Sequence, residues 1–334
     1  MIRLLCFLLI FTNIFAQNGE EIYQFLNLPT SARQSSLGGT MNAAWDEDPN
    51  VVLSNPATMN EKMQNQVGIN YALYLSDIKY GTLSYVHQLN DEKSYIAIGG
   101  RFVDYGKFLL TDEIGNNSGE FIAKDAAITL GYAYNIGDFL TAGTTLSYVN
   151  SQIETYNSSA IVADLGLVFH DIDYNYNIAF VIKNAGYQIK PYNAENEKLP
   201  LQINLGFNTR PQFVPVELSL TLSNLQNWNI SNPTSKNGQK SGFGKELIDH
   251  LSVGAEFFPD KGFNLRLGYN FKRGSELAVE DLRAFSGLSF GFGFKISYFR
   301  FDYSHARYHT SGNVNTFGLR INLDEILSKR YSWE

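Results

Sequence analysis

The sequence predicts an all-β protein, a transmembrane antiparallel β-barrel of about 14 strands, and three observations lead to that prediction. The chain has 20 Tyr, 24 Phe and 28 Gly against only 9 Pro and 4 Met, a composition typical of strands and turns. From Gln66 onward, apolar residues recur at every second position. The connections between these alternating runs are themselves alternately short and long.

The alternation is clearest where Val216, Leu218, Leu220 and Leu222 are interleaved with polar residues. A period of two places one set of side chains on each face of a strand. Fourteen such runs start near residues 66, 79, 94, 125, 139, 159, 176, 200, 215, 249, 263, 287, 298 and 315.

Charged residues within these runs all fall on the polar phase of the alternation. They are Arg101, Asp164, Lys183, Glu217, Glu256, Arg266, Lys295, Arg300, Asp302 and Arg320. A membrane barrel has this pattern, with apolar residues facing lipid and charges facing the lumen. A soluble β-sandwich would alternate in the same way, so the phase alone leaves both folds open.

Connection lengths separate the two folds, because membrane barrels have short periplasmic turns and longer outer loops. The connections predicted to be short cover residues 90–93, 136–138, 170–175, 210–214 and 259–262, with a turn near Ser297. Those predicted to be long cover residues 104–124, 150–158, 184–198, 224–250, 272–286 and 306–314. A sandwich gives no reason for this alternation, so we predict a barrel, with both chain ends on the periplasmic side.

The first residues predict export from the cytoplasm. Met1-Ile2-Arg3 is followed by an apolar run and by Ala16, the pattern of a signal peptide over residues 1–16. The apolar run is shorter than the ~20 residues that a spanning helix needs. Cys6 is the only cysteine, so no disulfide or thiolate metal site is expected after cleavage. The formal charge of −7 gives no footprint for nucleic acid.

Residues 17–64 lack the alternation and are predicted to form a hatch, or plug, in the lumen of the barrel at 65–324. Pro29 would end a short helix there. A C-terminal tail, residues 325–334, follows the last predicted strand; it ends on Glu334 instead of the aromatic residue common in outer-membrane barrels.

The predicted hatch carries a family resemblance. Leu37-Gly38-Gly39, an acidic stretch and then Asn55-Pro56-Ala57 resemble the hatch of the FadL-type transporters of long-chain fatty acids. Together with Phe25-Leu26-Asn27-Leu28-Pro29-Thr30-Ser31-Ala32-Arg33 and Lys183-Asn184-Ala185-Gly186, these steps are similar to the PorQ-like group, the FadL-like barrels of the type IX secretion system.

This resemblance implies a non-enzymatic component of type IX secretion in the outer membrane of a Bacteroidetes-type Gram-negative cell. It implies a scaffold for the cell-surface attachment complex, with a PorZ-like surface protein, PorU and PorV as partners. The outer connections at 104–124 and 224–250 are then the expected partner surface, because they are the longest. A FadL-like transporter of a hydrophobic small molecule is the alternative. It requires an apolar lumen, whereas the inward positions considered above are Gly, Ser, Thr, Asn and charged residues.

Catalytic, cofactor and metal sites are not expected. Ser76-Asp77-Ile78-Lys79 matches the S-x-x-K pattern but falls on a predicted hairpin, where no helix presents the serine. The luminal charges comprise six basic and four acidic residues, which suit either a selective pore or an ion-paired lumen that holds the hatch. The near balance of sign favours the ion-paired lumen.

Overall fold

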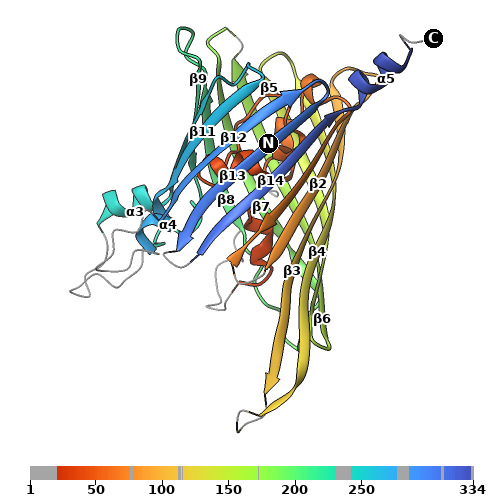
Figure 1. The fold of residues 1–334 in the computed structure, drawn as a ribbon, viewed down its shortest axis with the longest axis vertical. Helices are drawn as coiled ribbons and strands as arrows, with labels where there is room; N and C mark the ends of the chain where they lie inside the picture. Colours follow the sequence, from red (N-terminus) through yellow and green to blue (C-terminus); the bar gives the residue numbers. More distant parts are fainter. Residues whose placement is uncertain are drawn as a thin grey trace, which may run out of the picture.

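The computed structural model describes the chain except for residues 1–20, 76–77, 112–113, 115, 172, 231–241, 277–285, 310–311 and 332–334. The predicted signal peptide and Ser76 therefore lie outside the described residues. Fourteen antiparallel strands form one closed barrel, in which each strand pairs with its neighbours in sequence and β1 pairs with β14. Figure 1 shows the barrel from the side. The predicted fold is confirmed.

The strands are β1 (Gln66–Leu73), β2 (Lys79–Gln88), β3 (Ser94–Thr111), β4 (Asn117–Ile136), β5 (Leu140–Ile153), β6 (Tyr156–Asp171), β7 (Tyr176–Lys190), β8 (Gln202–Thr209), β9 (Val216–Leu222), β10 (Leu251–Phe257), β11 (Phe263–Asn270), β12 (Leu288–Ile296), β13 (Phe299–His309) and β14 (Gly312–Asn322). Three helices lie outside the wall, α3 (Phe243–Asp249), α4 (Phe271–Glu276) and α5 (Leu323–Tyr331). Among the described residues, no helix combines the length and apolar character needed to cross a bilayer.

The two ends of the barrel differ. Gln66 pairs with Asn322, so the first and last strands start and finish at one end, which we call the turn rim. We call the opposite end, to which the β3–β4 hairpin belongs, the loop rim; it is at the bottom of Figure 1. Helix α5 lies at the turn rim, where Lys295 contacts Glu325 at 3.4 Å. The C-terminal tail thus begins as a helix.

Several connections predicted to be long loops are instead continuations of strands. Pairing of β3 with β4 continues to Thr111 and Asn117, and Phe108 stacks on Phe121 at 5.2 Å. Strands β5 and β6 likewise pair up to Ile153 and Tyr156. The predicted loops at 104–124, 150–158 and 306–314 are therefore wrong over much of their length, and the loop predicted at 184–198 is wrong up to Lys190, where β7 ends. Their aromatic and β-branched residues favour extended pairing beyond the wall.

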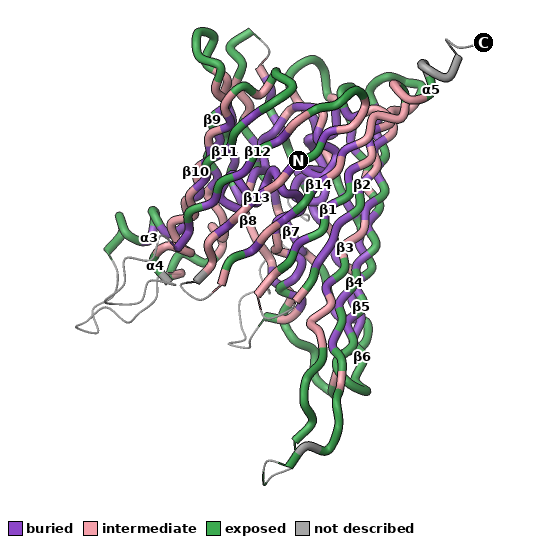
Figure 2. Tube along the Cα trace, in the orientation of Figure 1, coloured by how far each residue is buried: buried purple, intermediate pink, exposed green. Residues whose placement is uncertain are grey.

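The two faces of the wall are different in character. Buried and exposed residues alternate along most strands, as in β9 and β14 (Figure 2). Large apolar side chains such as Ile98, Ile128 and Leu146 are more than half exposed on the outer face. An outward apolar band of this kind is the surface that a membrane barrel presents to lipid.

Residues 21–64, which we call the luminal segment, lie inside the barrel (Figure 1). The segment consists of short helices, η2 (Gln24–Asn27), α2 (Ala32–Ser36), η3 (Pro49–Leu53), η4 (Pro56–Thr58) and η5 (Glu61–Met63). Helix α2 contacts β11 to β14, η3 contacts β1 and β2, and η4 contacts β4 to β6. Contacts in all these directions place the segment within the ring. Glu21 bridges to Lys198 in the β7–β8 connection at the loop rim, so the segment crosses the lumen to reach Gln66.

Candidate functional site: a lumen closed by the N-terminal segment

The Leu37-Gly38-Gly39 step ends helix α2 and presses it against the wall. The Ser31 hydroxyl caps the start of α2 by accepting from the Gln34 N–H at 3.0 Å. At the other end Gly38 and Gly39 have φ of +92° and +91°, a conformation that side chains disfavour. Glycine is also required on the wall, since a Cβ at Gly268 of β11 would lie 2.2 Å from the Gly38 nitrogen.

The Asn55-Pro56-Ala57 step forms a second contact with the wall. Asn55 accepts from the Ala57 N–H at 3.0 Å and donates to the Asn42 carbonyl at 2.7 Å, which links two turns of the segment. A Cβ added at Gly143 of β5 would lie 2.5 Å from the Pro56 carbonyl carbon. The predicted hatch motif residues are thus brought to the wall at two separate places.

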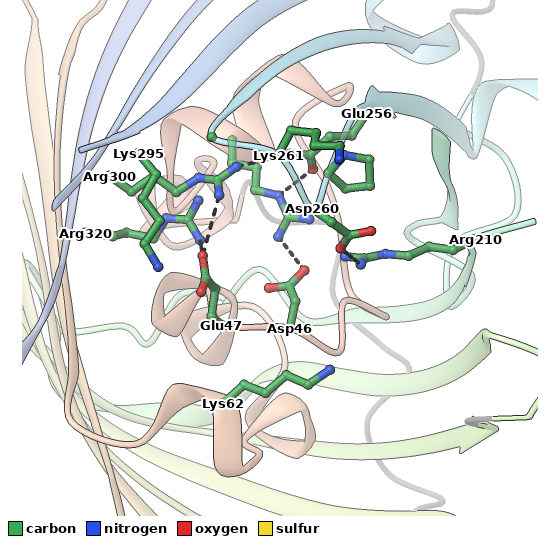
Figure 3. Close-up of a pocket in the computed structure, with 13 residues that line it drawn as sticks. Asp46, Glu47, Lys62, Arg210, Glu256, Asp260, Lys261, Lys295, Arg300 and Arg320 are labelled. Carbon is green, nitrogen blue, oxygen red and sulfur yellow. Dashed lines mark hydrogen bonds and ion pairs between the residues drawn. The ribbon is translucent and has the colours of Figure 1, made fainter. Parts of the chain in front are cut away.

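Arg33 joins the luminal segment to the barrel through four carboxylates. Its guanidinium lies 2.6 Å from Asp46 and 3.8 Å from Asp48 of the segment itself. It also lies 2.7 Å from Glu256 of β10 and 3.3 Å from Glu217 of β9. Arg33 is 3% exposed, so these pairs are shielded from water. Figure 3 labels Asp46 and Glu256, two of these carboxylates, among the wall residues that surround them.

The ion pairs fix the charge of the segment residues. Burial alone would lower the pKa of Arg33, but Asp46, Glu256, Glu217 and Asp48 together raise it well above its ordinary value. Burial would likewise raise the pKa of Asp46, but Arg33 and Arg210 lower it below its ordinary value. Both groups are therefore charged across the physiological pH range, and each depends on the other to remain buried.

The wall charges continue this network. Arg266 contacts Glu256 at 3.0 Å and Asp302 at 2.7 Å. Asp302 also contacts Arg320 at 3.2 Å and Arg300 at 3.8 Å. These predicted luminal charges lie together in the half of the lumen nearest the turn rim.

Four of the predicted luminal charges lie elsewhere. Arg101 donates to the carbonyls of Leu26 and Leu53 in the luminal segment, and Asp164 accepts from Thr145 at 2.9 Å. Lys183 is buried in the same region of the wall. Lys295 lines the cavity at the turn rim, where its exposed ammonium contacts Glu325 of α5 at 3.4 Å.

Sequence reasoning missed the residues of the luminal segment that complete the network. Arg33, Asp46 and Asp48 lie in a stretch without periodicity, so no face could be assigned to them. The only signal was the acidic run Asp46-Glu47-Asp48 close to a lone arginine. Arg210, which pairs with Glu217 beside Arg33, was placed in a turn.

Two cavities flank the luminal segment. The cavity at the turn rim measures about 340 Å³ and is bordered by charged side chains of the segment and of the wall (Figure 3). The cavity at the loop rim measures about 240 Å³ and lies between the segment and β8 to β11. Helix α2 and its ion pairs stand between the two.

The half of the lumen nearest the loop rim has an apolar wall, contrary to expectation. Its buried members from the barrel are Ala72, Tyr80, Val103, Ala127, Val149, Ala160, Val162 and Val314. Val103 and Val162 share the luminal phase with Arg101 and Asp164 and lie beyond these charges toward the loop rim. Two buried polar residues, Asp125 of β4 and Ser158 of β6, lie beside them. Tyr23, Phe25 and Leu26 of the luminal segment cover this wall. The inward positions considered from the sequence, which were Gly, Ser, Thr, Asn and charged residues, therefore do not represent this half of the lumen.

Comparisons with known proteins place the fold. No family model and no curated protein matches the sequence. Solved structures do match. The TodX monoaromatic hydrocarbon channel (a deltaS2 mutant) has a TM-score of 0.54 at 14% identity, over 88% of this chain and 98% of that one. The CymD monoaromatic hydrocarbon channel has a TM-score of 0.55 at 13% identity, over 88% and 97%. A Pseudomonas aeruginosa FadL homologue has a TM-score of 0.52 at 11% identity, over 88% and 98%.

The chain has the fold of a FadL-like outer-membrane barrel. The likeness extends over nearly the whole length of these similar structures, and at these identities it concerns the fold alone.

Proposed function

We propose that this FadL-like barrel admits a hydrophobic small molecule at the loop rim and that the luminal segment acts as its hatch. The apolar wall behind Phe25 and Leu26 carries this proposal, because it is a luminal surface suited to such a ligand. The fold supports it, since two of the similar structures are monoaromatic hydrocarbon channels.

In this proposal the described structure is the closed state. A ligand displaces Phe25 and Leu26 from Val103, Val149 and Val162 and takes over their apolar contacts. It then meets the ion-paired half of the lumen, where burying an apolar molecule among charges is unfavourable. Passage therefore requires the luminal segment to move, which breaks the contacts between Arg33 and the wall.

Two valines of β6 offer a matched test. Val162 belongs to the apolar wall, and Val168, equally buried, packs against Ala57 in the turn-rim half. An unpaired amide at either site costs about 1–3 kcal/mol. We expect Val162→Asn to reduce uptake of toluene by a Gram-negative host without hydrocarbon channels of its own, and Val168→Asn to leave most of it. Equal loss in both variants, with heat-modifiability on gels confirming folded barrels, would contradict the proposed route.

We propose, as a second candidate, a scaffold role in type IX secretion, in which a PorZ-like surface protein and the PorU and PorV components bind at the loop rim. The β3–β4 hairpin favours it, because its pairing continues past Asp104, where pairing of β3 with β2 ends. Leu109 is 64% exposed on this hairpin, and Phe108 and Ile122 are also exposed. An exposed apolar surface beyond the membrane suits a protein partner.

The scaffold role predicts capture through the hairpin. From detergent extracts of the native cell, the barrel should co-purify with a surface protein, and Leu109→Glu with Ile122→Glu should abolish this. The control is Phe213→Glu, at an exposed apolar residue of the β8–β9 connection, at the turn rim. If no protein co-purifies with the native barrel while toluene uptake persists, the transporter stands and the scaffold role is wrong. Within the other predicted partner loop, at 224–250, residues 231–241 lie outside the described part of the chain.

A further inference from the structure

The cavity at the loop rim has a polar lining, unlike the apolar wall. It lies against β8 to β11, and Leu28 and Tyr308, which pack against the apolar wall, border it on the other side. Side-chain amides and hydroxyls line it, among them those of Gln24, Asn27, Thr40, Gln202 and Ser223. The luminal segment forms its floor through Pro29, Gly39 and Thr40.

Several polar groups in this lining have unused hydrogen-bonding capacity. Thr40 Oγ1, Ser223 Oγ and Arg273 Nη1 are buried, and none has a hydrogen-bond partner within the described part of the chain. Buried polar groups in native proteins are almost always paired. Three unpaired groups around one cavity therefore indicate a ligand that supplies both donors and acceptors.

Arg273 is held rigidly for such a contact. Its guanidinium carbon lies 3.8 Å from the centroid of the Tyr308 ring, and its backbone N–H donates to Asn270 at 2.9 Å. Asn270 in turn donates to the Ser252 hydroxyl at 2.9 Å and to the Gly38 carbonyl at 3.3 Å. A preorganised donor loses little conformational entropy when a ligand binds.

The charge of the lining restricts the class of ligand. Asp249 offsets one of the two cations, Lys272 and Arg273, so the cavity has little net charge. Leu28, Pro29 and Ile230 give one small apolar side. Amides and hydroxyls each offer donors and acceptors, which match a ring that carries several hydroxyl groups. We propose that this cavity binds a neutral sugar, one ring in size, presented at the loop rim.

Saturation-transfer NMR on the full barrel tests the proposal, in a detergent without a sugar headgroup. The probes are glucose, galactose, mannose and N-acetylglucosamine. At least one should bind, and Gln202→Ala and Ser223→Ala should each weaken it about tenfold, the value of roughly one hydrogen bond. The matched control is Gln152→Ala, at an exposed glutamine of β5 that does not line the cavity. If no probe binds, or if all three variants bind equally, the proposal is wrong.

A second arm identifies the source of the sugar. The barrel is placed in phosphatidylcholine nanodiscs with and without a galactolipid, and free galactose is titrated in both. Competition by the galactolipid indicates a sugar carried on a lipid, and binding unaffected by it indicates a free sugar. Toluene uptake should be unchanged in Ser223→Ala. The proposed transport and the proposed sugar site can therefore be tested, and rejected, separately.

Discussion

Arg33→Met is expected to release the luminal segment from the wall and open the barrel to ions. The substitution leaves Asp46, Asp48, Glu217 and Glu256 without their shared cation in a buried site. Removing one partner of a buried ion pair costs about 3–5 kcal/mol, mainly because the other charge remains unpaired. Repulsion between segment and wall carboxylates then favours displacement. Planar-bilayer recordings should show an open-channel conductance that the wild-type barrel lacks.

Two further variants make this expectation specific. Lys107→Met removes a cation that pairs with Glu120 at 2.7 Å on the exposed β3–β4 hairpin, and it should change neither stability nor conductance. Arg33→Met combined with Asp46→Asn removes a carboxylate whose described ion pair is with Arg33, and it should restore part of the closed state. If the Arg33→Met barrel shows no open-channel conductance, packing alone, without the ion pairs, holds the luminal segment in place.

Gly268→Ala is expected to displace helix α2 although it adds a single methyl group. The new Cβ would lie 2.2 Å from the Gly38 nitrogen and 2.4 Å from the Leu37 carbonyl carbon, and both are backbone atoms. The Gly38 N–H also donates to the Ser289 hydroxyl of β12 at 3.1 Å, which opposes a local shift. Overpacking of this kind costs about 1–3 kcal/mol.

Amide hydrogen exchange measures this displacement directly. Protection of residues 34–39 should fall in Gly268→Ala and stay unchanged in Gly100→Ala. Gly100 is the control because it also lies in a strand, and the nearest atom to its added Cβ is 3.6 Å away. Undiminished protection in Gly268→Ala would mean that the segment is not seated against β11 as described.

The barrel could be predicted from the sequence because the bilayer imposes a pattern that is visible within each strand. A strand between lipid and lumen must alternate apolar and polar residues. The period of two in a run such as Val216 to Leu222 is therefore visible without knowledge of the neighbouring strands. The hairpin at β3 and β4 was predicted as a loop for the opposite reason. Phe108, Leu109 and Phe121 have strand propensity, but beyond the membrane no rule of length or polarity marks where a strand stops.

The site could be predicted only in part, because its contacts join distant parts of the chain. Arg33 meets Glu256 across 223 residues, and no sequence pattern records this pairing. The wall charges could be predicted because they fall on the polar positions of an alternating strand. Their partners in the luminal segment lie in a stretch without alternation, so no such prediction was possible for them. The apolar wall was overlooked because charged residues dominated the luminal phase. Val103 lies just two residues beyond Arg101 on the same face.

A disulfide between the luminal segment and the wall tests the central proposal, that passage requires the segment to move. The Cβ of Ala32 in α2 lies 3.4 Å from the position of a Cβ at Gly318 in β14, close to the ~3.8 Å between Cβ atoms in disulfides. Cys6, in the predicted signal peptide, is the only natural cysteine, so Ala32→Cys with Gly318→Cys introduces a single pair. We predict that toluene uptake falls to background when this pair is oxidised and returns on reduction. Full uptake by the oxidised, cross-linked barrel would contradict the proposal.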